Sequence, residues 1–248
     1  MHRFYLPPDD CKTGPLTLTG REAHHALRVL RVRRGEHVTV LDGEGGEFLC
    51  EVRDYDRDKV QLALVEKKPV FPRPARVTLL QAVPKGKIIE SIIQKATELG
   101  AACVVPLLTE RVISDLGEKS AERKAEKWQL VAVEAIKQCG ATWLPKVESP
   151  VTLEQFLARG EKFELPLIAS LQPGGRHARE IFETFKQSHG RKPESVCVWV
   201  GPEGDFTPAE AAAVQAAGAL PITLGRLVLR VETAATYCLS ILHHELNA

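Results

Sequence analysis

The chain of 248 residues, 44% of them hydrophobic, is long enough for one large or two smaller domains with an ordinary buried core. Its 33 basic and 32 acidic residues give a net charge of +1, so only local clustering of charge can indicate a nucleic-acid partner. The N-terminus lacks the apolar core of a signal peptide and no apolar run approaches bilayer length, which predicts a cytoplasmic protein without a membrane partner.

The first seventy residues predict a small, mostly β domain. Short runs of alternating or β-branched residues between turn residues indicate strands at Arg3–Leu6, Leu16–Leu18, His37–Leu41, Glu47–Arg53 and Lys59–Val65. The segment D-G-E-G-G at 42–46 contains a G-x-G, but it lies between two strands and precedes no helix. A hairpin turn is therefore favoured over a nucleotide-binding loop.

A short helix is predicted at Arg21–Arg31, and its Arg21, His25 and Arg28 recur at helical spacing on one face. The densest group of basic side chains in the chain lies on and after this helix: Arg21, His25, Arg28, Arg31, Arg33 and Arg34. Only Glu22 opposes it in this stretch. The group could hold the phosphates of a structured nucleic acid or form a solvated basic face.

The segment P-V-F-P-R-P at 69–74 predicts a linker and a domain boundary, because three prolines cannot continue a helix or a central strand. Beyond it, strands and helices alternate. Strands are expected at Val77–Val83, Cys103–Leu108, Leu165–Leu171, Ser195–Val200 and Leu220–Leu224. Helices are expected at Lys85–Leu99, Ser120–Cys139, after the capping residues Thr152 and Thr207, at His177–Ser188 and at Val231–Leu246. This alternation predicts an α/β fold whose mostly parallel sheet has helices on both faces.

Two glycine-containing loops leave predicted strands near the C-terminus, where open α/β sheets bind their ligands. The first, G-P-E-G-D at 201–205, precedes a helix and could cradle a phosphate, but Glu203 and Asp205 would repel one and no G-K-[ST] lysine is present. A ligand with hydroxyls, an amine or a positive centre, such as S-adenosylmethionine, fits better. Gly201 and Gly204 would let such a ligand approach closely, or they could merely shape a tight turn.

The cysteines and histidines predict no metal site. All six cysteines are scattered without a C-x-x-C pair, so we expect reduced thiols. The adjacent pairs His24-His25 and His243-His244 point in different directions on a helix. No G-x-G-x-x-G follows a predicted strand and opens a helix, which argues against a redox Rossmann enzyme.

The segments G-P-E-G-D-F-T-P-A-E at 201–210 and L-G-R-L-V-L-R-V-E-T-A at 224–234 resemble paired signatures of the ribosomal small subunit methyltransferase E family, in the SPOUT superfamily. Three more blocks are similar to this family in the same order. They are H-H-A-L-R-V-L-R-V-R-R-G-E at 24–36, K-G-K-I-I-E-S-I-I-Q-K-A-T-E-L-G at 85–100 and W-Q-L-V-A-V-E-A-I-K-Q-C-G at 128–140. The resemblance covers nearly the whole chain.

The resemblance implies a PUA-like, RNA-binding β-barrel over residues 1–70 and a SPOUT methyltransferase domain over 71–248 with a C-terminal trefoil knot. It implies a homodimer whose active site is completed across the interface. The implied reaction is S-adenosyl-L-methionine-dependent methylation of N3 of a uridine in small-subunit (16S) ribosomal RNA, free or in the assembled subunit, as a step of ribosome biogenesis.

The resemblance also implies site residues. Those expected to bind the cofactor come from three loops: Leu171, Gln172, Val200, Gly201, Pro202, Glu203, Gly204, Leu224, Gly225, Val228 and Leu229. Those expected to bind RNA are Arg21, His25, Arg28, Arg31 and Arg33. Because N3 of neutral uracil carries a proton, the reaction needs a base or a stabilising cation.

Arg230 and Glu232 are the catalytic candidates. Arg230 would stabilise the anionic base or a flanking phosphate, and Glu232 would orient the loop or accept the proton. The alternative is that the two form a structural ion pair at the start of the last helix.

The chain departs from the family pattern at four positions. Asp205 stands where glycine is expected, Ala141 and Leu227 where arginines are expected, and Val231 where threonine is usual. If the lost arginines contacted RNA, the target could differ. Two alternatives stay open: a non-catalytic RNA-binding or ribosome-assembly protein of the same fold, and a SPOUT methyltransferase that acts on another RNA.

Overall fold

The computed structural model describes residues 1–12, 15–70, 75–111, 118–172 and 174–247. The chain divides into two compact units, one of residues 1–73 with 133–144 and one of residues 74–132 with 145–248. The long helix α4 (Glu118–Cys139) contributes to both units. Residues 71–74 of the predicted linker lie outside the described part of the chain.

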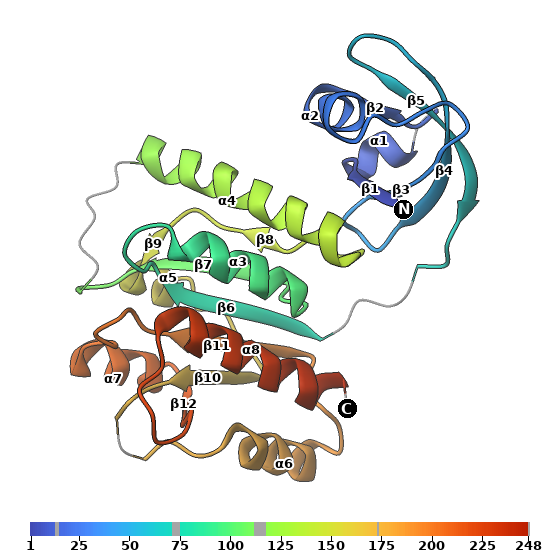
Figure 1. Cartoon of the computed structure of the whole chain (residues 1–248). Helices are drawn as coiled ribbons and strands as arrows, with labels where there is room; N and C mark the ends of the chain where they lie inside the picture. The colour runs from blue at the N-terminus through green and yellow to red at the C-terminus, as the bar shows by residue number, and fades with distance from the viewer. Residues whose placement is uncertain (13–14, 71–74, 112–117, 173, 248) are drawn as a thin grey trace. The chain divides into compact units, whose positions relative to one another are not determined.

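The first unit is built on a five-stranded sheet with the strand order β1-β3-β4-β5-β2 (Figure 1). Its strands are β1 (His2–Tyr5), β2 (Thr17–Leu18), β3 (His37–Leu41), β4 (Glu47–Tyr55) and β5 (Val60–Lys67). All pairs are antiparallel except β1 with β3. The five predicted strands are confirmed, and so is the hairpin turn between β3 and β4, where Asp42 Oδ1 accepts hydrogen bonds from the N–H groups of Glu44 and Gly46.

The helix predicted at Arg21–Arg31 is wrong in its geometry. An α-helix, α2 (Gly20–His24), continues as a π-helix, η1 (His25–Leu30), and Arg31 ends it in the left-handed conformation with φ of 54°. Because a π-helix has a wider turn than an α-helix, spacing of 3.6 residues no longer holds along this segment. His25 is half-buried beside the Phe4 ring, whereas Arg21 and Arg28 are exposed. The sequence also did not predict the short helix α1 (Pro8–Lys12).

A buried ion pair connects α2 to the end of α4 within the first unit. Lys137 Nζ lies 2.8 Å from Glu22 Oε1 and 3.1 Å from Glu134 Oε1, and the Lys137 side chain is only 7% exposed. The second oxygen of Glu22 accepts a hydrogen bond from the N–H of Tyr5. Glu22 therefore neutralises Lys137 rather than the surface arginines near it in sequence.

Replacing Lys137 with methionine should lower the free energy of unfolding by about 3 kcal/mol, because the Glu22 carboxylate would stay buried without its cation. Adding Glu22→Gln should restore most of this loss, since the buried charge is then removed. Urea denaturation of the wild type, the single variant and the double variant measures the effect. Lys146→Met, which breaks an exposed pair with Glu148, is the control and should cost less than about 1 kcal/mol. An equally small cost for Lys137→Met would contradict the prediction.

The second unit contains a seven-stranded sheet with the order β12-β10-β11-β6-β7-β8, and β9 also pairs with β7. All of these pairs are parallel, which confirms the predicted parallel sheet. The strands are β6 (Arg76–Ala82), β7 (Cys103–Leu108), β8 (Lys146–Val147), β9 (Val151–Thr152), β10 (Leu165–Ala169), β11 (Ser195–Val200) and β12 (Leu220–Ile222). The sequence did not predict β8 and β9, because two residues are too few to show a period.

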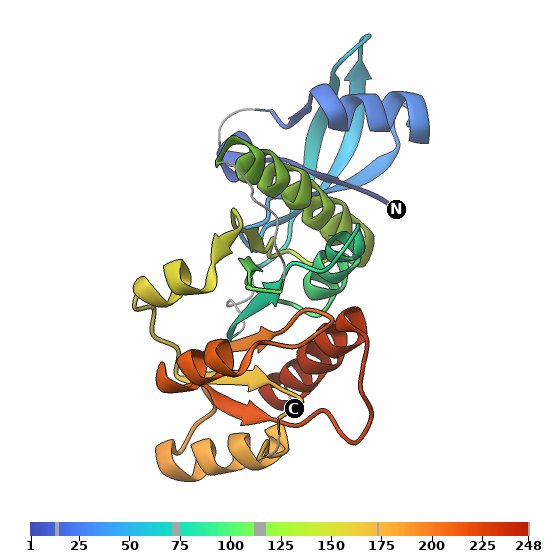
Figure 2. The same ribbon diagram turned by 90° about the vertical axis from the view of Figure 1, so that its left-hand side faces the viewer.

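Helices cover both faces of this sheet, as Figure 2 shows. They are α3 (Ile88–Glu98), α5 (Leu153–Ala158), α6 (Ala178–His189), α7 (Pro208–Ala216) and α8 (Val231–Asn247). Successive strand residues point to opposite faces. On one face, Leu80 and Trp199 pack with Phe156 of α5 and Val214 of α7. On the other face, α8 contacts α3, β6 and β11.

The ends of several elements differ from the predictions. β10 and β12 stop two residues early, at Ala169 and Ile222, so the residues after them belong to loops. α3 starts at Ile88 rather than Lys85. Both capping boxes, at Thr152 and Thr207, are confirmed.

A forked ion pair holds together the segments that lead into β10 and β11. The Arg191 guanidinium donates to both carboxylate oxygens of Glu164, at 2.9 and 2.6 Å, and the N–H of Glu194 donates to one of them. The hydrogen bonds from Arg191, and then the one from Glu194, lower the pKa of Glu164 to about 2 from its ordinary value of 4.5. The folded protein therefore favours the ionised carboxylate.

This pair predicts an acid-dependent loss of stability. Because the pKa of Glu164 is depressed in the folded state, its contribution is present above pH 4.5 and is lost as the pH falls toward 2. Glu164→Gln should therefore melt below the wild type at pH 7, and the difference should shrink through that window. Thermal unfolding followed by circular dichroism measures it. Arg191→Met should remove the same pH dependence; a gap between wild type and Glu164→Gln that does not change with pH would contradict the assignment.

Candidate functional site

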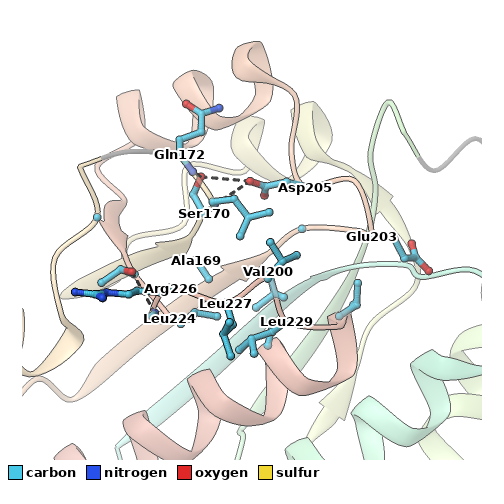
Figure 3. A pocket seen from close by; sticks show the side chains of 18 of the residues that line it. Ala169, Ser170, Gln172, Val200, Glu203, Asp205, Leu224, Arg226, Leu227 and Leu229 are labelled. Atoms are coloured by element: carbon cyan, nitrogen blue, oxygen red, sulfur yellow. Dashed lines mark hydrogen bonds between the residues drawn. The ribbon is translucent and has the colours of Figure 1, made fainter.

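The topology gathers three loops at one edge of the second sheet. β10 lies between β11 and β12, and all three strands run parallel, so the loops that follow them leave the sheet at the same edge. Arg176, in the first loop, bridges to Ile222 at the end of β12. A pocket of about 380 Å³ lies among the three loops (Figure 3).

Most of the residues predicted to bind the cofactor line this pocket. They are Leu171, Gln172, Val200, Gly201, Pro202, Glu203, Leu224, Gly225, Val228 and Leu229. Ten further residues line the pocket and were not named individually: Ala169, Ser170, Gly174, Gly175, Asp205, Thr223, Arg226, Leu227, Val231 and Ala234. Of these, Arg226 and Leu227 lie inside the loop predicted at Leu224–Leu229. The structure thus brings three separate sequence segments to one cavity, and cofactor contact by each residue stays a prediction.

Two roles were left open for Gly201 and Gly204, close approach of a ligand or a tight turn, and the structure supports the tight turn at Gly201. A Cβ on Gly201 would lie 2.9 Å from Asp205 Oδ1 and 3.0 Å from the backbone N of Phe206. Its own turn therefore requires this glycine, whatever ligand binds. Gly204 does not line the pocket, and a Cβ there would meet the flexible Arg111 side chain at 3.3 Å.

Asp205 adopts the left-handed conformation, with φ of 61°. Glycine takes this conformation without strain, which explains in physical terms why a glycine is expected at this position. Aspartate is one of the few other residues that tolerate it, because its short side chain can form local hydrogen bonds. The departure at position 205 is therefore compatible with the loop.

The sequence did not predict the polar contacts around the loop that follows β11. Glu203 accepts a hydrogen bond from the N–H of Lys85 at 3.1 Å, and Glu210 accepts one from the N–H of Glu110 at 2.8 Å. Arg111 donates to the carbonyl of Gly204. Glu110 and Arg111 are polar residues that follow β7 after Thr109, and their position at the end of a buried strand could have indicated them.

The two catalytic candidates flank the pocket rather than line it. Arg230 is exposed and Glu232 is half-buried in the first turn of α8, while Leu229 and Val231 line the cavity. Within the described part of the chain, neither residue forms an ion pair with the other, so the alternative of a structural Arg–Glu pair is not what this structure contains. The guanidinium and the carboxylate are both left for other partners.

The arginines on and after α2 divide into two groups. Arg21 lies 3.4 Å from Glu134, and Arg34 pairs with Asp54. Arg28, Arg31 and Arg33 are exposed, and the described residues offer no carboxylate within ion-pair distance of them. The second group is the one whose charge is free for an anionic partner.

The pocket suits an amphipathic molecule with a positive centre. Its volume is within the range of about 300 to 1,000 Å³ that ligand pockets have. Leu224 and Leu229 supply apolar surface, and Glu203 and Arg226 supply one charge of each sign. S-adenosylmethionine combines an aromatic base, hydroxyls, a carboxylate, an ammonium group and a sulfonium cation, so these residues fit it.

The described residues show no sign of a metal centre or a membrane-spanning helix. They contain no group of three or more His, Cys, Asp or Glu side chains that could hold a metal ion. They also contain no helix that is both long enough and apolar enough to cross a membrane. Burial raises the pKa of Cys197 and Cys238 to about 12, which keeps these thiols protonated.

Comparison with known proteins agrees with this fold and pocket. The RNA methyltransferase domain family matches residues 71–243, and the RNA methyltransferase PUA domain family matches residues 18–65. These two matches place the chain in the class of RNA methyltransferases. A ribosomal RNA small subunit methyltransferase E from Synechocystis is 36% identical over 241 residues, which cover 96% of this chain and 76% of the relative. The chain belongs to the ribosomal RNA small subunit methyltransferase E family.

Two solved structures extend the comparison. A protein from Legionella pneumophila, described as a methyltransferase in complex with the bound cofactor SAM, is 32% identical with a TM-score of 0.86, over 98% of this chain and 96% of that one. A ribosomal RNA small subunit methyltransferase E from Neisseria gonorrhoeae, bound to S-adenosyl methionine, is 26% identical with a TM-score of 0.84, over 98% and 97%. The family resemblance seen in the sequence is confirmed.

Proposed function

We propose that the chain is an S-adenosylmethionine-dependent methyltransferase of small-subunit (16S) ribosomal RNA and that it modifies N3 of a uridine. The observation that carries the proposal is the pocket, where three loops from three adjacent parallel strands meet. The relatives support it, since one is named for this substrate and two were crystallised with the cofactor. The alternative of a non-catalytic RNA-binding protein is not favoured, because the pocket is retained.

Different pocket residues would bind different parts of the ligand. When bound, S-adenosylmethionine supplies a methyl group on a positively charged sulfur. Leu224 and Leu229 would exclude water from the apolar part of the ligand, and Glu203 would favour its positive charge. Backbone groups of the three loops would orient its polar edges.

The residues that flank the pocket would act on the uracil. N3 of uracil must lose its proton as it bonds to the methyl carbon, while the bond from that carbon to sulfur breaks and neutral S-adenosylhomocysteine is left. The base becomes anionic if the proton leaves first. The Arg230 guanidinium would oppose that negative charge, and the Glu232 carboxylate would accept the proton directly or through a water. The target base must also be unpaired to reach the pocket.

Three features are proposed on the family resemblance. We infer that the C-terminal segment containing both glycine loops forms the trefoil knot of the SPOUT superfamily. We infer that the enzyme is a homodimer, whose partner completes the active site. We also infer that it acts in the cytoplasm, where ribosomal subunits are assembled.

The first unit would hold the RNA through exposed arginines. Replacing Arg28, Arg31 and Arg33 together with alanine should weaken binding similarly for different RNA sequences and reduce the slope of log K against log salt by about 2. Filter binding at several salt concentrations measures both. Arg34→Ala is the matched control, because Arg34 is already paired with Asp54. An unchanged slope in the triple variant would remove this surface from the RNA-binding site.

The function is tested in two steps. Isothermal titration calorimetry with S-adenosylmethionine should give saturable binding, and its absence would favour the RNA-binding scaffold. Radiolabelled cofactor is then offered with free 16S RNA and with small subunits from cells that lack the enzyme. Mass spectrometry of the digested RNA should identify 3-methyluridine. A ribose-methylated product would instead indicate the other SPOUT chemistry.

A further inference from the structure

Asp205 connects two of the three loops that form the pocket (Figure 3). Its Oδ1 accepts a hydrogen bond from the N–H of Phe206 at 2.8 Å, within its own loop. Its Oδ2 accepts one from the N–H of Leu171 at 3.0 Å, in the loop after β10. The two oxygens of one carboxylate thus hold donors from two different segments.

Ser170 extends this connection. Its hydroxyl lies 3.5 Å from Asp205 Oδ2, in position to donate to it, and accepts a hydrogen bond from the N–H of Gln172 at 3.1 Å. Three consecutive residues, Ser170, Leu171 and Gln172, are therefore held directly or indirectly by one side chain. All three line the pocket.

These contacts require a carboxylate. Asparagine has one amide oxygen, so it could accept from Leu171 or from Phe206 but not from both, and its NH₂ group would face the second donor. Glycine, which the family pattern leads us to expect at this position, would accept from neither. Leu171 is 61% exposed, so little side-chain burial would hold its segment in place without the carboxylate.

We propose that Asp205 is a positioning residue that fixes the loop after β10 against the loop after β11 and keeps the cofactor pocket formed before the ligand binds. The inference rests on the proposed function for the identity of that ligand. If the loop after β10 samples other conformations when Asp205 is absent, the apparent affinity falls by the fraction of molecules that remain competent to bind.

The alternative role for Asp205 is direct attraction of the ligand's positive charge. The two roles predict different ligand selectivity. In the positioning role, Asp205 acts as a clamp between the two loops. Losing this clamp affects S-adenosylmethionine and the product S-adenosylhomocysteine equally, because both bind between the same loops. A direct charge contact affects S-adenosylmethionine more, because only it carries the sulfonium.

Calorimetry on Asp205→Gly separates these roles, since glycine takes the φ of 61° without strain. We expect affinity for both ligands to fall about tenfold and by the same factor. Asp205→Asn, which keeps one acceptor, should lie between wild type and Asp205→Gly. A loss confined to S-adenosylmethionine, or no loss at all, would overturn the clamp.

Hydrogen exchange in the ligand-free protein tests the clamp without any cofactor. The amide of Leu171 should exchange at least about tenfold faster in Asp205→Gly than in wild type, because its acceptor is gone. The amide of Glu210, held by Thr207 in the capping box, is the internal control and should not change. Unchanged exchange at Leu171 would refute the inference. If wild type binds no cofactor, the proposed function fails, while this exchange result still decides the clamp.

Discussion

Replacing Arg230 with alanine should lower the rate of methyl transfer by about 100-fold, while affinity for S-adenosylmethionine stays within about threefold of wild type. Arg230 does not line the pocket, so the cofactor does not need it. Its guanidinium is exposed, and its chain neighbours Leu229 and Val231 both line the cavity. In the proposed mechanism, a cation placed there would stabilise negative charge that develops on the base rather than the bound cofactor.

Single-turnover kinetics with saturating cofactor and small subunits measures this rate separately from binding. Arg230→Lys keeps the charge but not the planar fork of donors, so it should retain part of the rate. Arg226→Ala is the matched control from the same loop, because Arg226 lines the pocket and should change cofactor affinity instead. Full activity of Arg230→Ala would remove Arg230 from the mechanism.

Glu232→Gln in the same assay distinguishes between the two roles proposed for the carboxylate. If Glu232 accepts the proton, the lost rate should recover as the pH rises, because hydroxide can then remove the proton from N3. If it only orients the loop, the rate should stay low across the pH range. The comparison assigns the general base without requiring a structure of the RNA complex.

Half of the residues that line the pocket could be predicted from the sequence, because they are contiguous in short segments that resemble family signatures. Gly201 directly follows β11 and Leu224 lies two residues beyond the end of β12, and parallel strands place such segments at one edge of the sheet. The roles of Gly175 and Asp205 could not be found in this way. Their roles depend on contacts between loops, Gly175 with the backbone of Ile222 and Asp205 with Leu171, and no local pattern records such pairs.

The prediction of an α-helix at Arg21–Arg31 was wrong for a different reason. The apolar period at 21–31 is close to that of an α-helix, and nothing in the residue types indicates a π-helix. The left-handed Arg31 and the hydrogen bond from the N–H of Val32 to the carbonyl of Ala26 close the segment with a wider turn. The ring of Phe4 packs edge-on against His25 at the start of this π-helix, and tertiary contacts of this kind can override the geometry that periodicity favours.

Replacing Gly201 with alanine should weaken S-adenosylmethionine binding by at least about 30-fold, because a Cβ cannot fit without moving the turn that carries Asp205. The closest atoms to that Cβ include Phe206 N at 3.0 Å and Asp205 Cα at 3.1 Å, which are backbone atoms and cannot rotate away. Any shift of this turn also displaces Glu203 and the acceptor of the Leu171 amide, so two walls of the pocket move together.

Gly204→Ala is the matched control, three residues along the same loop. Neither Gly201 nor Gly204 has a positive φ, so alanine adds only its Cβ at either position. At Gly204 the new atom would meet the Arg111 side chain, which can rotate, and binding should change less than about threefold. Calorimetry on both variants, with thermal unfolding to confirm that each is folded, measures the difference. Equal losses would mean that the loop tolerates neither side chain and that backbone crowding at Gly201 is not what shapes the pocket. Binding retained in both variants would mean that the turn can move without deforming the site.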